Sequence, residues 1–347
     1  MHSLLFLKNL WYFVLHGDSL KRGKLRQKKI LGEKIVFGRD ENGKPFALRD
    51  NCPHRGVPLS DGTFNGNRIQ CCYHGWQFDC SGTCQKIPAL ADNKLDVTKI
   101  KVFAYPCKEL NGTIWVYVPE NKFQMVDAEN RLPDLLVPPD KRFLAVQSVV
   151  IPVNIDHATV GLIDPAHVTF VHQSWFWRSA KSMRLKEKQF EPIGIGFRMM
   201  RHKPSANSKG YSLLKGSTST EISFQLPAHR FEHIQIGDNH VLVSITILTP
   251  IDEKTTELNH IIYSSLSITK YLWWPLKNLA AAFICQDVHV FEKLRKGLES
   301  DPKLMLLGDA DTQARWYFEL KKHWHAAQAN GTEFVNPLQP QRLKWIT

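Results

Sequence analysis

The chain has 347 residues, enough for about two domains at roughly 150 residues each. Hydrophobic residues make up 43% and charged residues 22%, a composition typical of a folded globular protein. The 45 Lys and Arg residues outnumber the 33 Asp and Glu residues, giving a net charge of +12 that favours acidic partners or anionic substrates. No nucleic-acid motif or aromatic stacking pattern accompanies the basic residues, so we expect no nucleic-acid partner.

Two apolar stretches are too interrupted or too short to be a signal peptide or a membrane helix. Residues 3–16 contain Lys8 and Asn9, and no small-residue cleavage site follows them. Residues 271–285 contain Lys277 and fall short of the ~20 residues that a membrane helix needs, so we expect a buried helix there. We therefore predict a cytoplasmic protein without membrane contact, in which clustered cysteine and histidine residues bind metal rather than form disulfides.

The first third of the chain is predicted to be β structure. Residues 34–50 contain two strand-like runs around Glu41-Asn42-Gly43, and residues 102–118 repeat this arrangement around Asn111-Gly112. Such turn residues between strand-like runs predict β-hairpins. A basic run precedes the first hairpin and could dock an acidic electron-transfer partner, although a solvated face is the simpler explanation. Its members are Lys21, Arg22, Lys24, Arg26, Lys28 and Lys29.

Two Cys/His pairs in this β region have the spacing of a metal site. Cys52 and His54 form the first pair, and Cys71 and His74 form the second. Four such ligands on two loops suit tetrahedral zinc, or a [2Fe–2S] cluster in which two histidines bind one iron and two cysteines the other. Cysteine precedes histidine in both pairs, and a glycine closely follows each pair and lets the loop aim backbone N–H groups at sulfur. Both features favour the cluster.

A change of composition between residues 119 and 140, toward Pro, Asp, Glu and Asn, predicts a linker. We therefore place one domain at residues 1–120 and a second at residues 121–347. The second domain has strand-like runs at 143–153 and between 220 and 268, and its last seventy residues or so are predicted to be helical. An all-β domain followed by a mixed domain gives an α+β fold class.

The second domain contains a further group of candidate metal ligands. Asp164, His167 and His172 lie close together, and two histidines with a later carboxylate are a ligand set that binds Fe(II) and leaves faces open for O2 and substrate. Asp164 and His167 are three residues apart and would share one helix face, whereas His172 is five further on, about 500° around a helix. We expect the helix to break or bulge so that both histidines reach one metal. Asp164 could alternatively be a helix N-cap, with Pro165 at the first helical position.

These motifs resemble those of Rieske-type oxygenases. "CPHRG" at residues 52–56 and "CYHGW" at residues 72–76 are similar to the two Rieske loops, whose second loop usually runs Cys-Pro-Tyr-His-Gly-Trp. Cys71 then takes the ligand position, and Cys72 stands where proline is usual and is expected to be a small buried residue. The pattern Asn-x-x-Asp-x-x-His-x-x-x-x-His, followed by a later aspartate, is matched except that Gly161 replaces the asparagine.

The resemblance implies an all-β Rieske domain and a catalytic domain with an antiparallel sheet and helices, of the helix-grip type. The [2Fe–2S] ligands would be Cys52, His54, Cys71 and His74. The mononuclear Fe(II) ligands would be His167, His172 and Asp287. The resemblance also implies that Asp164 bridges His167 to the cluster histidine of the next subunit, so that the chain would form a homotrimer.

The implied function is that of a terminal oxygenase component. It would take electrons from a reductase or ferredoxin, and indirectly from NAD(P)H, and use O2 as cosubstrate to hydroxylate or demethylate a small aromatic or polycyclic molecule. The alternatives are a ring-dihydroxylating dioxygenase and a Rieske electron-transfer protein without oxygenase activity. Residues after His172 could line the substrate pocket, although ordinary core packing would also explain them. They are Trp175, Phe176, Trp177 and Arg178.

Overall fold

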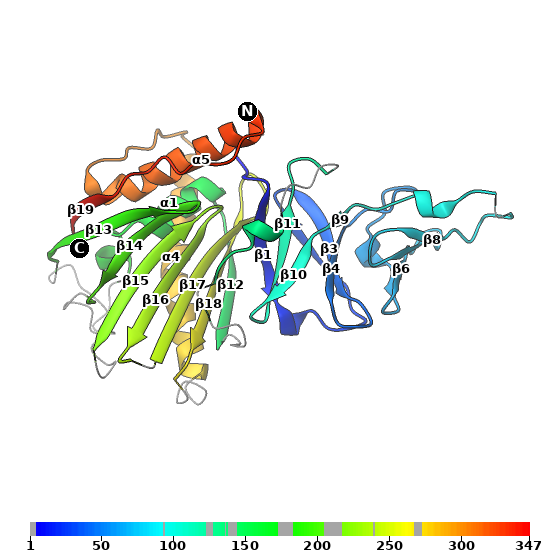
Figure 1. Cartoon of the computed structure of the whole chain (residues 1–347), viewed down its shortest axis with the longest axis horizontal. Helices are drawn as coiled ribbons and strands as arrows, with labels where there is room; N and C mark the ends of the chain where they lie inside the picture. Colours follow the sequence, from blue (N-terminus) through cyan, green and yellow to red (C-terminus); the bar gives the residue numbers. More distant parts are fainter. Residues whose placement is uncertain are drawn as a thin grey trace. The chain divides into compact units, whose positions relative to one another are not determined.

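The computed structural model describes residues 5–92, 94–122, 128–135, 137, 144–172, 183–204, 217–238, 240–266 and 273–347. The chain divides into two compact units, Lys8–Pro133 and Asp134–Thr347, and residues 5–7 belong to the second unit (Figure 1). A hydrogen bond of 2.9 Å from Lys321 Nζ to the Leu5 carbonyl oxygen helps to hold them there. The division falls after residue 133 rather than after residue 120, where the change of composition begins.

The first unit consists of short strands in three antiparallel sheets with the orders β1-β11-β10, β2-β3-β4-β9 and β5-β6-β7-β8. The strands are β1 Leu10–His16, β2 Arg26–Ile30, β3 Glu33–Arg39, β4 Pro45–Arg49, β5 Thr63–Phe64, β6 Arg68–Gln70, β7 Gln77–Asp79, β8 Cys84–Lys86, β9 Ala104–Tyr105, β10 Cys107–Leu110 and β11 Thr113–Val118. Single 3-10 turns connect some of them: η2 Gly17–Ser19, η3 Leu59–Asp61, η4 Val97–Lys99 and η5 Glu129–Arg131.

Both predicted hairpins are present in this unit. β3 pairs with β4 across the turn that contains Gly43, and β10 pairs with β11 across Asn111 and Gly112. Asn111 has φ 47° and Gly112 has φ 77°, the left-handed conformations that a two-residue hairpin turn requires. The turn chemistry thus determined where these strands reverse.

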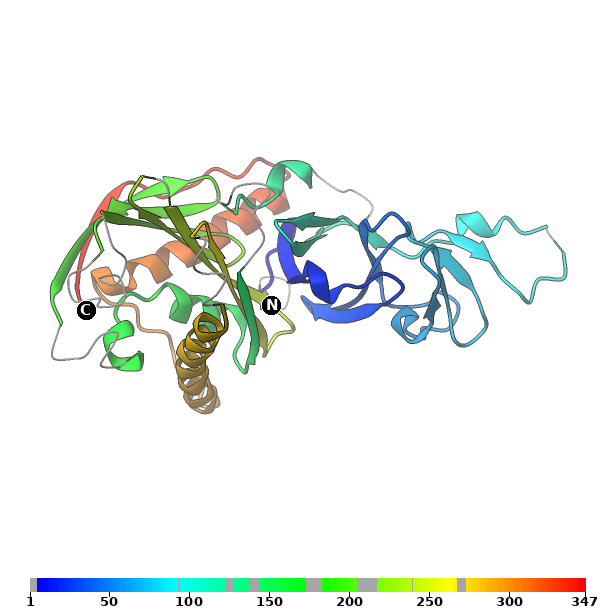
Figure 2. The same ribbon diagram turned by 90° about the horizontal axis from the view of Figure 1, so that it is seen from below.

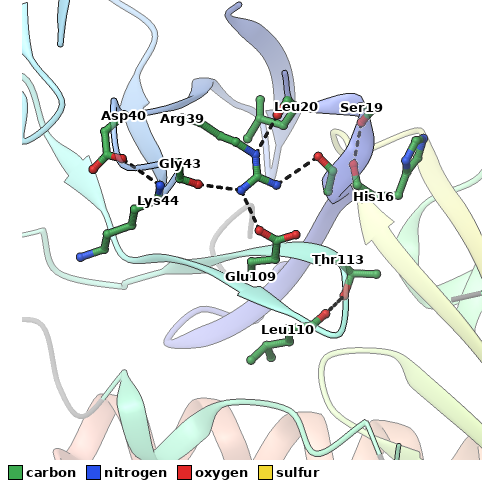
Figure 3. A network of polar contacts seen from close by, with 11 residues as sticks. His16, Ser19, Leu20, Arg39, Asp40, Gly43, Lys44, Glu109, Leu110 and Thr113 are labelled. Carbon is green, nitrogen blue, oxygen red and sulfur yellow. Dashed lines mark hydrogen bonds and ion pairs between the residues drawn. The ribbon is translucent and has the colours of Figure 1, made fainter. Parts of the chain in front are cut away.

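Arg39, at the end of β3, joins segments of the first unit that are far apart in sequence (Figure 3). Its Nη1 donates to Glu109 Oε2 of β10 at 2.7 Å and to the Gly43 carbonyl at 2.9 Å. Its Nε and Nη2 donate to the carbonyls of Leu20 and Gly17 at 2.8 and 3.1 Å. A fork of five N–H donors suits such a position, because one side chain of β3 satisfies three carbonyls of turn segments and a carboxylate of β10, a strand of another sheet.

The second unit is built on an eight-stranded antiparallel sheet with the order β12-β18-β17-β16-β15-β14-β13-β19 (Figures 1 and 2). The strands are β12 Ala145–Ile151, β13 Leu185–Ile193, β14 Gly196–His202, β15 Thr218–Gln225, β16 His229–Ile236, β17 His240–Pro250, β18 Thr256–Ser264 and β19 Gln341–Ile346. The strand-like runs predicted for this region correspond to β12 and to β15 through β18.

Two helices lie on the same face of this sheet. Among the described residues of this unit, the helices are α1 Ile155–Ile163, α2 Val168–Val171, α4 Trp273–Leu298 and α5 Thr312–Asn330, with a 3-10 turn η8 at Asp309–Asp311. The ring of Phe224 on β15 packs on Tyr317 of α5, and Gln147 Nε2 on β12 donates to the Lys277 carbonyl of α4 at 3.4 Å. Cross-strand register places Gln147 and Phe224 on one face, so α4 and α5 share it.

The end of the chain differs from the prediction. Residues 273–298 and 312–330 are helical as expected, but Gln341–Ile346 form β19, which pairs with β13 at the edge of the sheet. An edge strand depends on a partner more than a hundred residues away, and local sequence carries little signal of such pairing. Among the described helices, none combines the length and apolarity needed to cross a membrane.

The buried histidine of β16 predicts a dependence of stability on pH. His229 is 2% exposed, and burial lowers its pKa to about 3. Below pH 6.5 the His229 side chain binds a proton in the unfolded chain but stays neutral in the folded protein. The free energy of unfolding therefore falls as the pH drops. Between pH 6.5 and 5 this side chain should remove ~2 kcal/mol. Denaturant unfolding of the metal-free protein at pH 7 and pH 5 measures the loss.

The His229→Gln variant should lose less stability between these two pH values than the parent protein. The matched control is His240→Gln, because His240 lies exposed on the neighbouring strand β17. Equal pH dependence in the parent and in His229→Gln would contradict the assignment.

Candidate functional site

The two Cys/His loops of the first unit have the same backbone design. In each loop the backbone N–H of the cysteine, Cys52 or Cys71, donates to the carbonyl of the residue five positions later. The N–H of the glycine four positions after the cysteine donates to the carbonyl of that cysteine. These distances are 2.9 and 2.8 Å in the loop of Cys52, and 2.8 and 3.1 Å in the loop of Cys71. Gly56 and Gly75 have φ of 77° and 71°, a conformation that a larger residue adopts with strain. Each loop therefore closes tightly around its cysteine.

The loops turn their thiols inward and their imidazoles outward. Cys52 and Cys71 are each 2% exposed and belong to the apolar cluster that contains Leu59. The pKa of the Cys52 thiol is raised to about 11, chiefly by burial and also by the neighbouring Cys71, although the backbone N–H groups of His54 and Arg55 act in the opposite direction. Two buried thiols beside each other, with backbone donors aimed at sulfur, suit thiolate ligands of a cluster.

The imidazoles of His54 and His74 face each other with ring centroids 4.4 Å apart. Trp76 stacks on His54, with centroids 4.7 Å apart and an interplanar angle of 5°. Desolvation and the neighbouring His74 and Arg55 lower the pKa of His54, which favours the neutral ring that a metal needs. The four side chains predicted as [2Fe–2S] ligands thus lie on two adjoining loops, and their chemistry fits the cluster.

Cys72 corrects one expectation. The sequence suggested a small buried residue, but Cys72 is exposed whereas its neighbour Cys71 is buried. Tyr73, which follows, is 56% exposed, and its ring lies 3.9 Å from that of His74. Residues 72 and 73 therefore form the outer rim of the loop, because the tight closure around Cys71 leaves them no place in the core.

Asp50 supports the first loop and was missed in the sequence. Its carboxylate is two residues before Cys52, and the residue is 3% exposed. It accepts hydrogen bonds of 2.7 Å from both the N–H and the hydroxyl of Ser60, and one of 2.6 Å from Gln27 Nε2. A buried carboxylate with several donors is a stable anchor. An aspartate before a loop is usually exposed, so its sequence position alone carried no sign of this role.

In the second unit the helix breaks before His167, between α1 and α2, and not between His167 and His172, which lie at the two ends of α2. Asp164 is the C-cap of α1, His167 is the N-cap of α2, and His172 follows the last residue of α2. Asp164 and His167 therefore lie in the connecting turn rather than on one helix face. The N-cap interpretation of Asp164 is wrong, since its Oδ1 accepts the N–H of Ala166 at 2.6 Å before α2 begins.

Both histidines nevertheless reach one carboxylate of α4. The donor atoms of His167, His172 and Asp287 all lie within 4.8 Å of one another. His172 Nε2 is 3.2 Å and His167 Nε2 is 3.9 Å from Asp287 Oδ1. His172 is 2% exposed, and its Nε2 is buried without a hydrogen-bond partner. Two imidazole nitrogens converging on a carboxylate oxygen, one of them unsatisfied, fit a divalent transition metal.

The Nδ1 atoms of the two histidines, which point away from Asp287, have different neighbours. His167 Nδ1 lies 3.7 Å from Asp164 Oδ2, and His172 Nδ1 lies 2.9 Å from Gln286 Oε1. Burial lowers the pKa of His167, while the charges of Asp164 and Asp287 oppose that shift, so the ring stays neutral and can bind metal. Gln286 was not singled out in the sequence, because its role depends on where α4 docks.

Gly161, which departs from the family pattern, has a steric explanation. A Cβ added at this position would lie 2.8 Å from Cζ of Phe291, an α4 residue that is 7% exposed. The aromatic ring thus occupies the space that a side chain at residue 161 would need. Its close approach brings α4, and with it Asp287, against α1.

Polar side chains cross the sheet between α4 and α5. His260, Thr246 and Arg230 are opposite one another on neighbouring strands of the face that carries both helices. Thr246 Oγ1 lies 3.0 Å from His260 Nδ1. Burial, and then the charge of Arg230, lower the pKa of His260 to about 4, whereas Glu232 and Asp287 raise it. This polar row is near enough to Asp287 to sense its charge.

Four predicted pocket residues, Trp175, Phe176, Trp177 and Arg178, lie outside the described residues. The remaining features define a class: a protein with a Cys/His cluster site in a β domain and a His/His/Asp metal site in an α+β domain. Two family models agree with this division. Residues 10–106 match the Rieske [2Fe-2S] domain, and residues 161–318 match the Vanillate O-demethylase oxygenase C-terminal domain.

Individual relatives match parts of the chain. It is 36% identical over 174 residues to the chloroplastic chlorophyllide a oxygenase of Chlamydomonas reinhardtii, an alignment covering 50% of this chain and 25% of that protein. It is 39% identical over 119 residues to the methylxanthine N1-demethylase NdmA of Pseudomonas putida, covering 32% of each. These sequence alignments thus span only a minor part of the length of the relatives.

Solved structures match nearly the whole chain. Dicamba monooxygenase bound to dicamba superposes with a TM-score of 0.77 at 20% identity, covering 94% of this chain and 99% of that one. Pseudomonas putida NdmA with caffeine gives a TM-score of 0.75 at 21% identity, covering 95% and 96%. At this identity the likeness shows the fold, and the two domain matches add the family. The chain belongs to the Rieske-type non-haem iron oxygenases.

The adjacent cysteines give a sharp test of the first site. Cys71→Ser should abolish the visible absorption and the reduced-state EPR signal of the cluster, because the neighbouring thiol of Cys72 is exposed and does not take the buried position. Cys72→Ser and Cys72→Pro should keep both signals, since Cys72 is exposed on the rim. Loss of the cluster in Cys72→Ser with retention in Cys71→Ser would reverse the assignment.

Proposed function

We propose that the chain is the terminal component of an oxygenase that hydroxylates or oxidatively demethylates a small organic molecule. The observation that carries the proposal is the convergence of His167, His172 and Asp287 in a chain that also has a Rieske domain. When bound, the [2Fe–2S] cluster supplies electrons one at a time, and the mononuclear Fe(II) supplies the activation of O2.

The residues of the chain then have distinct tasks. Cys52, His54, Cys71 and His74 are proposed to hold the cluster. His167, His172 and Asp287 are proposed to hold the mononuclear iron through three ligands, which leaves positions for O2 and substrate. Phe283 stacks on His172 with centroids 3.6 Å apart, and this ring helps to exclude water from the ligand face.

Electrons are proposed to arrive from a separate reductase or ferredoxin, which draws them from NAD(P)H. Asp164 is proposed to connect His167 with His74 of a neighbouring copy in a homotrimer. Its carboxylate lies 3.7 Å from His167 Nδ1, and its side chain is 31% exposed, so it can contact His167 of its own chain and a residue of a second chain at the same time. The exposed Phe170 and Tyr73, next to the two centres, are suited to such a contact.

The substrate is proposed to be an aromatic or polycyclic molecule that also carries a hydrogen-bonding group. His260, Thr246 and Arg230 supply polar contacts on the helix-bearing face of the sheet. The relatives are described as acting on chlorophyllide a and on methylxanthine, which are ring systems with polar substituents. A cytoplasmic location stays a prediction, because the chlorophyllide relative is chloroplastic.

Two alternatives keep some support. A relative from Comamonas testosteroni, 32% identical over 117 residues, is a 3-chlorobenzoate-3,4-dioxygenase oxygenase subunit, so dihydroxylation uses a related domain. Products formed under isotopically labelled O2 separate the two reactions, because a dioxygenase places both labelled atoms in one product. The other alternative, electron transfer without oxygenation, would leave the converging triad without a purpose.

The iron content tests the proposal directly. The parent chain should bind two irons in the cluster and one at the triad. His167→Ala should lose one iron per chain and all substrate turnover, while the cluster spectrum survives, because the two sites lie in separate units. Two irons in the parent protein, or unchanged turnover in His167→Ala, would contradict an oxygenase function.

Asp164 gives a separate test of the connection between subunits. Asp164→Asn keeps the size of the side chain but removes the charge beside His167. It should lower turnover by more than tenfold while each chain keeps its cluster and its mononuclear iron. Single-turnover oxidation of the pre-reduced cluster, followed in the visible spectrum, should slow in parallel. A monomeric parent protein, or a normal oxidation rate in the variant, would refute the bridge.

A further inference from the structure

The imidazole of His172 is held from three directions by one helix. Phe283 stacks on the ring with centroids 3.6 Å apart and an interplanar angle of 16°. Gln286 Oε1 lies 2.9 Å from Nδ1, and Asp287 Oδ1 lies 3.2 Å from Nε2. Residues 283, 286 and 287 are spaced i, i+3 and i+4 in α4, so they share one helix face.

His172's own segment contributes little to this orientation. α2 has only four residues, and His172 is its C-cap with φ −96° and ψ 43°, outside the helical range. An isolated turn of this length is not stable by itself. The direction of the ring therefore depends on α4, and the hydrogen bond to Gln286 is the polar part of that support.

The chemistry of an amide decides which nitrogen of His172 can bind metal. Gln286 offers a carbonyl oxygen that only accepts, so Nδ1 must carry the proton and donate it. The lone pair of the neutral ring is then on Nε2, the nitrogen that faces Asp287. Nε2 is buried without a hydrogen-bond partner, as expected of an atom reserved for a ligand bond.

The two histidines differ in the charge of the side chain that lies beside Nδ1. His167 has the Asp164 carboxylate beside its Nδ1 at 3.7 Å, whereas His172 has a neutral amide at hydrogen-bonding distance. His172 is also less accessible than His167, since its side chain is 1% exposed and that of His167 is 22% exposed. The more buried histidine thus has the neutral partner.

We propose that Gln286 is a positioning residue that fixes the tautomer and orientation of His172 and thereby sets the metal affinity of the triad. This inference rests on the proposed mononuclear metal site. The tasks of these two neighbouring residues are complementary. Gln286 holds Nδ1 of His172, and Asp287 binds the same metal ion as Nε2 of His172.

The test uses Co(II), bound to the mononuclear site of full-length protein that keeps its cluster. Gln286→Leu removes the acceptor, and its dissociation constant for Co(II) should rise at least tenfold above that of the parent. Gln286→Glu keeps an acceptor at the same place and should bind Co(II) no more weakly than the parent. The matched control, Cys285→Ser, changes the exposed neighbour on α4 and should leave the affinity unchanged.

A spectroscopic readout separates positioning from general loss of structure. Proton NMR of the Co(II) protein should show two shifted, solvent-exchangeable N–H signals, one from each histidine. The Nδ1–H of His172, which is buried and hydrogen-bonded, should exchange more slowly than that of His167. Gln286→Glu should retain the slow signal, and Gln286→Leu should lose it or exchange it rapidly. The parent protein alone already tests the idea, because two equally fast signals would overturn it.

The possible failures are distinguishable. If the parent protein binds no Co(II) at the triad, the proposed metal site fails, and this inference fails with it. If the parent binds Co(II) and Gln286→Leu binds it equally well, the metal site stands and the role of Gln286 is refuted.

Discussion

The site in the second unit depends on one geometric constraint, the five-residue spacing of His167 and His172. On a continuous helix their rings would point in different directions. α1 ends at Ile163, the chain turns at Asp164, and the two histidines lie at the ends of α2, a helix of only four residues. This short segment needs outside support, and α4 supplies it through Phe283, Gln286 and Asp287. The close approach of Phe291 to Gly161 brings α4 near enough to do so.

The first unit obeys a related constraint on a smaller scale. Each loop must present a buried sulfur and an outward imidazole only two or three residues apart. A positive-φ glycine and two backbone hydrogen bonds close the loop around the cysteine, and the apolar cluster holds the sulfur. The carboxylate of Asp50 then fixes the start of the first loop. Both sites thus use short, tightly closed segments whose geometry is imposed by neighbouring elements.

Much of the fold could be predicted from local patterns. The Asn111-Gly112 turn indicated a hairpin, and the strand-like runs at residues 143–153 and between 220 and 268 indicated β12 and β15 through β18. The edge strand β19 was missed because pairing between β13 and β19 joins distant parts of the chain. Cys72 was expected to be buried and is exposed, since the pattern that chose Cys71 as ligand carried no information on which side of the loop its neighbour faces.

The sequence by itself determined the chemistry: two cysteines and two histidines at cluster spacing, and two histidines with a carboxylate for a second metal. Residue identity and spacing limit which ions can bind, so these features are visible without a fold. Tertiary structure alone decided which side chains support the ligands. Gln286 meets His172 across 114 residues, and Asp50 meets Ser60 and Gln27 from different strands and turns. Such contacts depend on how helices and strands dock, which local sequence does not specify.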